Sequence, residues 1–199
     1  MNTVRRTDGY RKYQSPNPVV RWLIERFFAR ITAQIEALQP ARIIDLGCGE
    51  GLVAMRLMDG LQGIDYVGID VSEEMLGMAR SNCPGSTFIR GDLLQMDIES
   101  TSSDMLLCLE VLEHLPRPQA LLSRLASLPQ KGAIFSVPWE PFFRLGSLLR
   151  GNYVRRLGNH PGHVQQFGRR AFAELLSAYY PRLEVQTCFP WIFASARPG

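Results

Sequence analysis

Four residues that could hold a cofactor lie close together, between Asp45 and Gly51. An apolar run leads into Asp45, and glycines follow at 47, 49 and 51. Such a glycine-dense turn lets the backbone come close to a bound cofactor. The spacing is G-x-G-x-G with an acid two residues before the first glycine, whereas a turn that holds a dinucleotide pyrophosphate reads G-x-G-x-x-G. A carboxylate there favours a positively charged cofactor over a phosphorylated one. The alternative is a strand–turn–helix whose glycines are incidental.

Three more acids stand at or just after the ends of apolar runs. They are Asp70, Asp92 and Glu110. In an open sheet of parallel strands the carboxyl ends meet at one edge, and an acid about 20 residues beyond the glycine turn is placed to bind ribose hydroxyls. A single acid at a strand end could be only a helix cap. Four acids in this order are hard to explain by capping alone, so we expect them to surround one ligand.

These segments resemble the motifs of one family, the class I S-adenosylmethionine-dependent methyltransferases. Asp45–Gly51 is similar to the first motif of that family, Gly68–Ser72 to the second, Gly91–Leu93 to the third, and Leu109–Leu115 to the segment after the fourth strand. The resemblance covers roughly residues 40–140, and the chain most resembles the small bacterial ubiquinone-pathway O-methyltransferases. It implies an α/β fold, a Rossmann-like three-layer sandwich around a seven-stranded, mostly parallel sheet with one antiparallel strand.

The resemblance implies S-adenosylmethionine as the cofactor and assigns residues to it. The implied binding set is Asp45, Gly47, Gly49, Gly51, Asp70, Val71, Met75, Gly91, Asp92, Leu93, Leu109 and Glu110. By family correspondence Asp45 and the glycines surround the methionine portion of the donor, and Asp70 binds the ribose. Asp92 takes the exocyclic amine of the adenine, while the main chain near Leu109 and Glu110 closes the site.

All three histidines of the chain lie beside this expected site. If residues 110–114 form a helical turn, then Glu110, Glu113 and His114 share one face. With His163 from a glycine- and proline-rich loop they could bind a divalent cation, Mg²⁺, Mn²⁺ or Zn²⁺. This set resembles the metal site of two methyltransferase subgroups. In other relatives the same segment carries no known metal, and the histidine is structural or borders the donor. For proton removal from an acceptor we expect His114 or His163 to act.

Length, composition and charge indicate what kind of protein carries these residues. The chain has 199 residues, 46% of them hydrophobic, and a formal net charge of +3. That length fits one domain, residues 1–199. No run of 18 apolar residues occurs, and the four cysteines show no paired spacing, so we expect a cytoplasmic protein with reduced thiols.

Two segments flank the expected methyltransferase core. Residues 1–38 contain a helix that begins at Asn17-Pro18, and we expect it to pack on the core, with the preceding residues as a lid. Residues 138–170 form a basic insertion over the active site. Its arginines are Arg144, Arg150, Arg155, Arg156, Arg169 and Arg170, with no acid between Glu140 and Glu174. It is either a solvated face or a surface for an anionic substrate, an acidic membrane contacted through 142–156, or nucleic acid.

The sequence therefore predicts methyl transfer from S-adenosylmethionine, with O-methylation of a small-molecule acceptor, anionic or amphiphilic, as the leading hypothesis. An RNA 2′-O-methyltransferase is the first alternative. We do not expect nucleic acid as the partner, because the basic stretch is short and no separate RNA-binding domain is evident. The second alternative is a non-catalytic regulatory protein that binds the donor.

Overall fold

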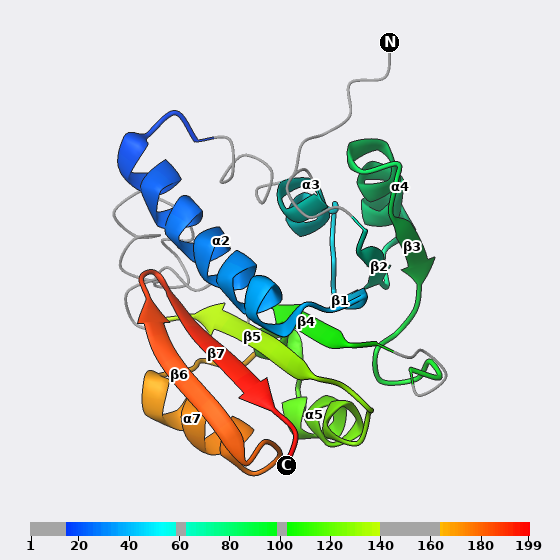
Figure 1. Ribbon diagram of the computed structural model, residues 1–199. Coiled ribbons are helices and arrows are strands. Elements are labelled where there is room, and N and C mark those ends of the chain that lie inside the picture. The colour runs from blue at the N-terminus through cyan, green and yellow to red at the C-terminus, as the bar shows by residue number, and fades with distance from the viewer. Residues whose placement is uncertain (1–14, 59–62, 99–102, 140–163) are drawn as a thin grey trace.

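The computed structural model describes residues 15–58, 63–98, 103–139 and 164–199. A seven-stranded sheet with the order β3-β2-β1-β4-β5-β7-β6 lies at its centre (Figure 1). The strands are β1 (Arg42–Leu46), β2 (Asp65–Asp70), β3 (Thr87–Arg90), β4 (Met105–Leu109), β5 (Gly132–Pro138), β6 (Arg182–Cys188) and β7 (Trp191–Arg197). Only β7 runs against its neighbours, pairing antiparallel with β5 and β6. The predicted fold is therefore confirmed.

The central strands are apolar because both of their faces are covered. β4 and β5 are buried along their whole length, as expected for strands between two helical layers. The edge strands β3 and β6 are mostly exposed or half-buried, with one buried residue each. Because β1 pairs in parallel with both β2 and β4, the carboxyl ends of these three strands lie side by side, at the edge where the sequence predicts the site.

Helices cover both faces of the sheet. On one face lie α2 (Pro18–Leu38), α3 (Leu52–Met58) and α4 (Glu73–Asn82), whose buried residues share a core with Ile43 and Tyr66. On the other lie α5 (Pro118–Ala126) and α7 (Arg169–Ser177), which pack on Ile44 and Leu46. A short 3-10 helix, η1 (Leu112–His114), follows β4. This is the three-layer sandwich that the resemblance implies.

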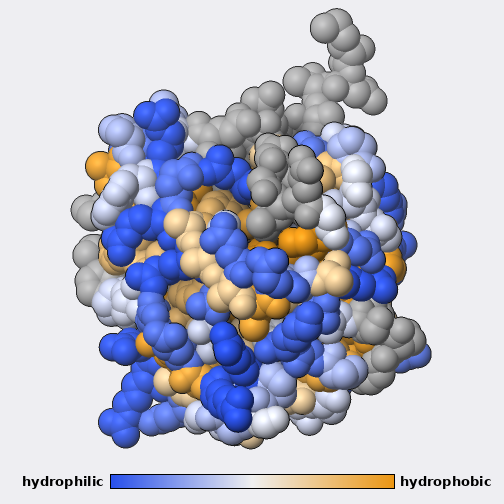
Figure 2. Space-filling view, in the orientation of Figure 1, coloured by the Kyte–Doolittle hydropathy of each residue, from blue (hydrophilic) through white to orange (hydrophobic). Residues whose placement is uncertain are grey.

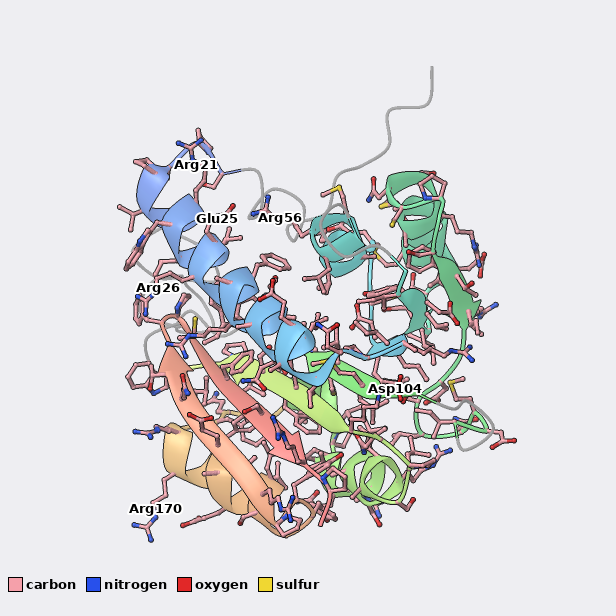
Figure 3. All side chains as sticks on the ribbon, in the orientation of Figure 1. Arg21, Glu25, Arg26, Arg56, Asp104 and Arg170 are labelled. Atoms are coloured by element: carbon pink, nitrogen blue, oxygen red, sulfur yellow. The ribbon has the colours of Figure 1, made fainter. Side chains whose placement is uncertain are left out.

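The helix over residues 18–38 begins as predicted. The Asn17 side chain accepts hydrogen bonds from the N–H groups of Val19 and Val20, and Pro18 occupies the first turn, so the helix start is capped. Glu25 of α2 and Arg56 of α3 point toward one another and form an ion pair (Figure 3), which ties this helix to the one that follows the glycine turn. Its predicted partner, a lid before residue 15, lies outside the described residues.

The C-terminal helix starts earlier than the sequence pattern predicts. The apolar periodicity indicates a helix over 172–180, but α7 spans Arg169–Ser177. Its first turn carries the exposed Arg169 and Arg170, which an apolar pattern cannot detect. Arg170 reaches outward and pairs with Glu174 one turn later (Figure 3).

The surface in the view of Figure 2 is largely hydrophilic, with smaller apolar areas between charged side chains. Among the helices of the described ranges, none is both long and apolar enough to cross a bilayer.

Candidate active site

The glycine turn between β1 and α3 has the backbone that its glycines predict. Gly47, Gly49 and Gly51 have φ angles of 77°, 54° and 75°, in the left-handed region that glycine adopts without strain. The N–H groups of Gly47 and Cys48 both donate to the carbonyl of Ile69 on β2, at 2.8 and 3.0 Å. The turn is thus fastened to the neighbouring strand, and its residues Gly47 and Gly49 are half-buried.

Asp70 connects the end of β2 to the glycine turn. Its Oδ2 accepts a hydrogen bond from the Gly49 N–H at 2.9 Å, and its Oδ1 accepts one from the Ser72 N–H at 2.9 Å. Ser72 in turn caps α4 by accepting from the Met75 N–H. The carboxylate predicted to bind ribose is therefore held by two backbone donors directly beside the glycine turn.

The remaining donor-site candidates flank Asp70. The Gly91 N–H donates to the Asp70 carbonyl at 2.9 Å, which places the predicted third motif against the second. Asp92 accepts from the Leu94 N–H at 2.9 Å and from Gln95 Nε2 at 2.8 Å. Val71 is 64% exposed although it is apolar, so its side chain offers a hydrophobic contact at the tip of β2. Met75 is half-buried and Leu93 is buried.

Asp45 lies beneath the glycine turn, 2% exposed. The hydroxyl of Tyr66 on β2 donates a hydrogen bond to its Oδ2. Burial raises the pKa of Asp45 to about 7, the Tyr66 hydrogen bond opposes that rise, and the charge of Asp70 adds to it. The sequence pattern did not identify Tyr66. Its only signal is strand alternation, which puts Tyr66 on the same sheet face as Asp45 once the register Ile43↔Tyr66 is known.

Glu110 stands at the end of β4 in a strained backbone conformation. Its φ is 56°, in a region where a residue other than glycine is uncommon. The Glu110 N–H donates to the Ser136 carbonyl at 2.9 Å, and Oε1 accepts a hydrogen bond from Trp191 Nε1 at 2.7 Å. Trp191 is 1% exposed and its ring lies 4.8 Å from that of Phe27 on α2. The contact joins β4 to β7, and sequence reasoning missed Trp191 because nothing local marks it.

The segment after β4 differs from the prediction. Residues 110–114 do not form one helical turn, because Glu110 has a left-handed backbone and only Leu112–His114 is helical, as a 3-10 turn. Glu113 is 2% exposed and packed inward, whereas His114 is exposed. The helical turn over 110–114 on which the shared face was predicted is therefore wrong.

A metal site remains a prediction. Within the part of the chain that the structure describes, no three His, Cys, Asp or Glu side chains are grouped so that they could hold an ion. The fourth predicted ligand, His163, lies outside the described residues, as do His160 and four of the insertion's arginines, Arg144, Arg150, Arg155 and Arg156.

A cavity of about 740 Å³ lies elsewhere, between α7 and β6. It is lined by Arg169, Tyr180 and Leu183 among others. Strand β6 is the outer edge of the sheet on the far side of β4 and β5 from β1. This cavity is therefore remote from the glycine turn, and the chemistry of the acids and glycines does not involve it.

Gly47 and Gly49 allow a paired test of the turn. A Cβ at Gly47 would lie 2.5 Å from Val111 Cγ2, whereas a Cβ at Gly49 would meet no atom within 4 Å. Both have positive φ. We expect Gly49→Ala to lower the free energy of unfolding by about 1–2 kcal/mol, the cost of left-handed backbone. Gly47→Ala should cost roughly 1 kcal/mol more, because Val111 must also move. Urea titration measures both, and equal losses would contradict the contact of Val111 with the turn.

Comparison with known proteins agrees with the motifs. A family model described as a methyltransferase domain matches residues 44–137, which contain the glycine turn, all four strand-end acids and β5 except its last residue, Pro138. The chain belongs to the class I S-adenosylmethionine-dependent methyltransferases. The free cysteines Cys48, Cys83, Cys108 and Cys188 form no disulfide in this methyltransferase fold.

Curated relatives of this methyltransferase match it over part of their length. The trans-aconitate 2-methyltransferase of Methylobacterium nodulans is 34% identical over 128 residues, covering 62% of this chain and 49% of the relative. The ubiquinone biosynthesis O-methyltransferase of an Azoarcus species is 29% identical over 160 residues, covering 68% of this chain and 65% of the relative. The chain thus spans between half and two thirds of the relatives it matches here.

Solved structures share the fold of this methyltransferase. Magnesium protoporphyrin IX methyltransferase from Synechocystis, crystallised with bound S-adenosylhomocysteine, superposes with a TM-score of 0.68 at 22% identity over 97% of this chain and 95% of that chain. The small RNA methyltransferase HEN1 gives a TM-score of 0.70 at 19% identity over 87% of this chain and 25% of that chain. Identities this low establish the common fold alone.

Proposed function

We propose that this protein transfers a methyl group from S-adenosylmethionine to an oxygen atom of a small-molecule acceptor. One observation carries the donor half of the proposal: Asp70 at the end of β2 binds the backbone of Gly49 at 2.9 Å. The second motif is thereby joined to the first, and a carboxylate stands beside a turn that ligands can approach closely.

The residues present fit the donor. The side-chain oxygens of Asp70 suit ribose hydroxyls, the exposed Val71 suits an adenine face, and Asp92 suits an exocyclic amine. The donor supplies a methyl group already activated on a positively charged sulfur. The protein therefore contributes binding, alignment with the acceptor and removal of the acceptor proton.

For the acceptor, support comes from the relatives and from the end of β4. The named relatives include O-methyltransferases of ubiquinone biosynthesis and a methyltransferase of trans-aconitate. His114 is exposed just beyond β4, and histidine is the side chain that most often serves as a general base. We propose it as the base, with His163 as the alternative outside the described residues. Acceptor contact through the basic insertion, and membrane contact through 142–156, remain proposals about that same outlying segment.

A divalent cation is not part of the proposed mechanism. The prediction requires a helical turn over residues 110–114, and only Leu112–His114 is helical, as a 3-10 turn. Dialysis against EDTA tests this directly. Activity that falls on EDTA treatment and returns with Mg²⁺, Mn²⁺ or Zn²⁺ would restore the metal hypothesis.

The function is tested by supplying the donor with a panel of acceptors. We expect S-adenosylhomocysteine to form, by chromatography, with trans-aconitate or with a catechol such as 3,4-dihydroxybenzoate. With the catechol, whose hydroxyl must lose a proton, we also expect His114→Gln to lower the rate by about 10²-fold or more, the usual contribution of a general base; the carboxylates of trans-aconitate carry no proton to remove, so its rate should not depend on this base. Donor binding without product from any acceptor would favour the non-catalytic alternative. Product formed only with small RNA would favour the RNA 2′-O-methyltransferase.

A further inference from the structure

The buried pair of Asp45 and Tyr66 is not explained by the proposed reaction. Both side chains are 2% exposed and joined by a hydrogen bond from the Tyr66 hydroxyl to Asp45 Oδ2. The sheet register sets Asp45 opposite Gly68, and the space above Gly68 is filled by Cys48 Sγ and the ring of Phe88. The pair is therefore closed off from solvent directly beneath the glycine turn.

The groups around Asp45 influence whether its carboxyl group is ionised. The titratable groups that face it are Tyr66 from β2, Cys48 from the glycine turn, Cys108 from β4, and Asp70 from the tip of β2. Burial raises the pKa values of Tyr66, Cys48 and Cys108, so these three are neutral. Asp70 is the one group among them whose carboxylate touches the backbone of the donor turn. Among the described residues, Asp45 thus accepts one side-chain hydrogen bond, from the neutral Tyr66 hydroxyl, and it lies close to the Asp70 carboxylate.

Asp45 lies within electrostatic range of the groups at the glycine turn. The charge of Asp70 adds to the rise in the pKa of Asp45, and the Asp70 carboxylate accepts a hydrogen bond from the Gly49 N–H in that turn. A cation held over that turn is therefore within electrostatic range of Asp45, in surroundings that screen charge less than water does. The methyl donor carries a positive sulfur, whereas its demethylated product has a neutral one. The two ligands differ by one unit of charge at this place.

We propose that Asp45 and Tyr66 form a proton-dependent selectivity element: Asp45, ionised against the Tyr66 hydroxyl, favours the cationic donor over its neutral product. The inference rests on the proposed donor site and adds the residue that decides between donor and product. Tyr66 acts as a positioning residue, because its hydroxyl stabilises the ionised form of Asp45. By linkage, a donor that favours the ionised form drives a proton off Asp45 when it binds, and the product does not.

The test is calorimetric titration of S-adenosylmethionine and S-adenosylhomocysteine at pH 6 and pH 8. For the parent protein we expect the ratio of donor affinity to product affinity to rise about tenfold from pH 6 to pH 8. Each ligand's own α-amino group also titrates in this range, at about pH 8 in peptides. That contribution is the same for every variant, so the informative quantity is the difference from Asp45→Asn, whose side chain does not titrate.

Three variants separate the roles. Asp45→Asn should remove the part of the pH dependence of the affinity ratio that comes from the protein. Tyr66→Phe should keep it but move its midpoint to higher pH, because the ionised carboxylate loses its donor; loss of packing alone would leave the midpoint in place. Asp104→Asn, at the opposite, amino end of β4, should leave the dependence unchanged.

A second measurement keeps the inference testable if Asp45→Asn does not fold. Titrations of the parent near pH 7 in two buffers of different ionisation enthalpy count the protons released on binding. We expect more protons to be released with the donor than with the product, and an equal release would overturn the inference. A parent ratio that matches Asp45→Asn at both pH values would overturn it as well. Absence of binding by both ligands would instead refute the proposed donor site.

Discussion

Replacing Asp70 with alanine is expected to weaken binding of S-adenosylmethionine by about 5- to 150-fold. The reason is that hydrogen bonds to a charged group contribute roughly 1–3 kcal/mol each when a ligand depends on them. In this protein two kinds of contact are lost, because Asp70 also accepts hydrogen bonds from the Gly49 and Ser72 N–H groups. The substitution removes the ribose contact and releases the glycine turn. Calorimetry on the purified variant measures the effect.

Asp70→Asn separates those two contributions. Its amide oxygen still accepts one backbone hydrogen bond, but the charge and the second acceptor are gone. We expect its affinity for the donor to fall between that of the parent and that of Asp70→Ala. If alanine at this position left the affinity for the donor unchanged, Asp70 would have no role in binding the ribose.

The second large effect is a gain in stability. Asp45→Asn is expected to raise the free energy of unfolding at pH 8 by up to about 4 kcal/mol, since each pKa unit corresponds to about 1.4 kcal/mol and burial raises the pKa of Asp45 from 3.8 to about 7. The asparagine amide can still accept the Tyr66 hydrogen bond and carries no charge to desolvate. Donor binding should suffer while the fold gains.

The direction of the pH dependence follows from that raised pKa. Below about pH 4 Asp45 is protonated in both the folded and the unfolded chain, so it causes no loss. Between about pH 4 and pH 7 only the folded chain keeps the proton, and the stability that this group contributes is lost as the pH rises through the folded value of about 7. The difference in stability between Asp45→Asn and the parent should therefore grow from pH 4 to pH 7 and then level off. Urea unfolding across that range measures it.

Asp104 provides a control of opposite sign. It lies at the amino end of β4, where it accepts the Ala41 N–H at 2.6 Å and pairs with Lys131 at 3.3 Å (Figure 3). These contacts, the Ala41 hydrogen bond above all, lower the pKa of Asp104. Its contribution is present at neutral pH and is lost as the pH falls. Asp104→Asn should therefore destabilise the protein at neutral pH, and the loss should shrink toward acid. A gain like that of Asp45→Asn would contradict the assigned environments.

The parts of the fold that the sequence predicted are those with local signals. Glycines at 47, 49 and 51 marked a turn because their backbone angles are ones that few other residues adopt. Asp45 and Asp70 marked strand ends because apolar runs stop there. The cap at Asn17 marked the start of α2. Each of these signals lies within a few residues of the structure it predicts.

The two contacts that the sequence did not predict join distant segments. Tyr66 meets Asp45 across a strand pairing, and Trp191 meets Glu110 across β5, which separates β4 from β7 in the sheet. A tyrosine or tryptophan in a strand reads as core packing until the register is known. The prediction of a helical turn over 110–114 was wrong for a related reason. The left-handed Glu110 bonds to Ser136 and Trp191, which are distant in the sequence, and the spacing of residues along a helix carries no information on such contacts.

The place of β7 has a consequence for synthesis of the chain. β7 lies between β5 and β6 in the sheet but follows both in the sequence. A ribosome thus completes β5 roughly 50 residues before Trp191 emerges, an interval on the order of 3–10 seconds at typical elongation rates. Until then the apolar β5, buried along its whole length in the finished fold, is an unpaired edge on the nascent chain. Such an edge can pair with other chains. A chaperone that shields β5 would therefore be needed most during this interval of synthesis.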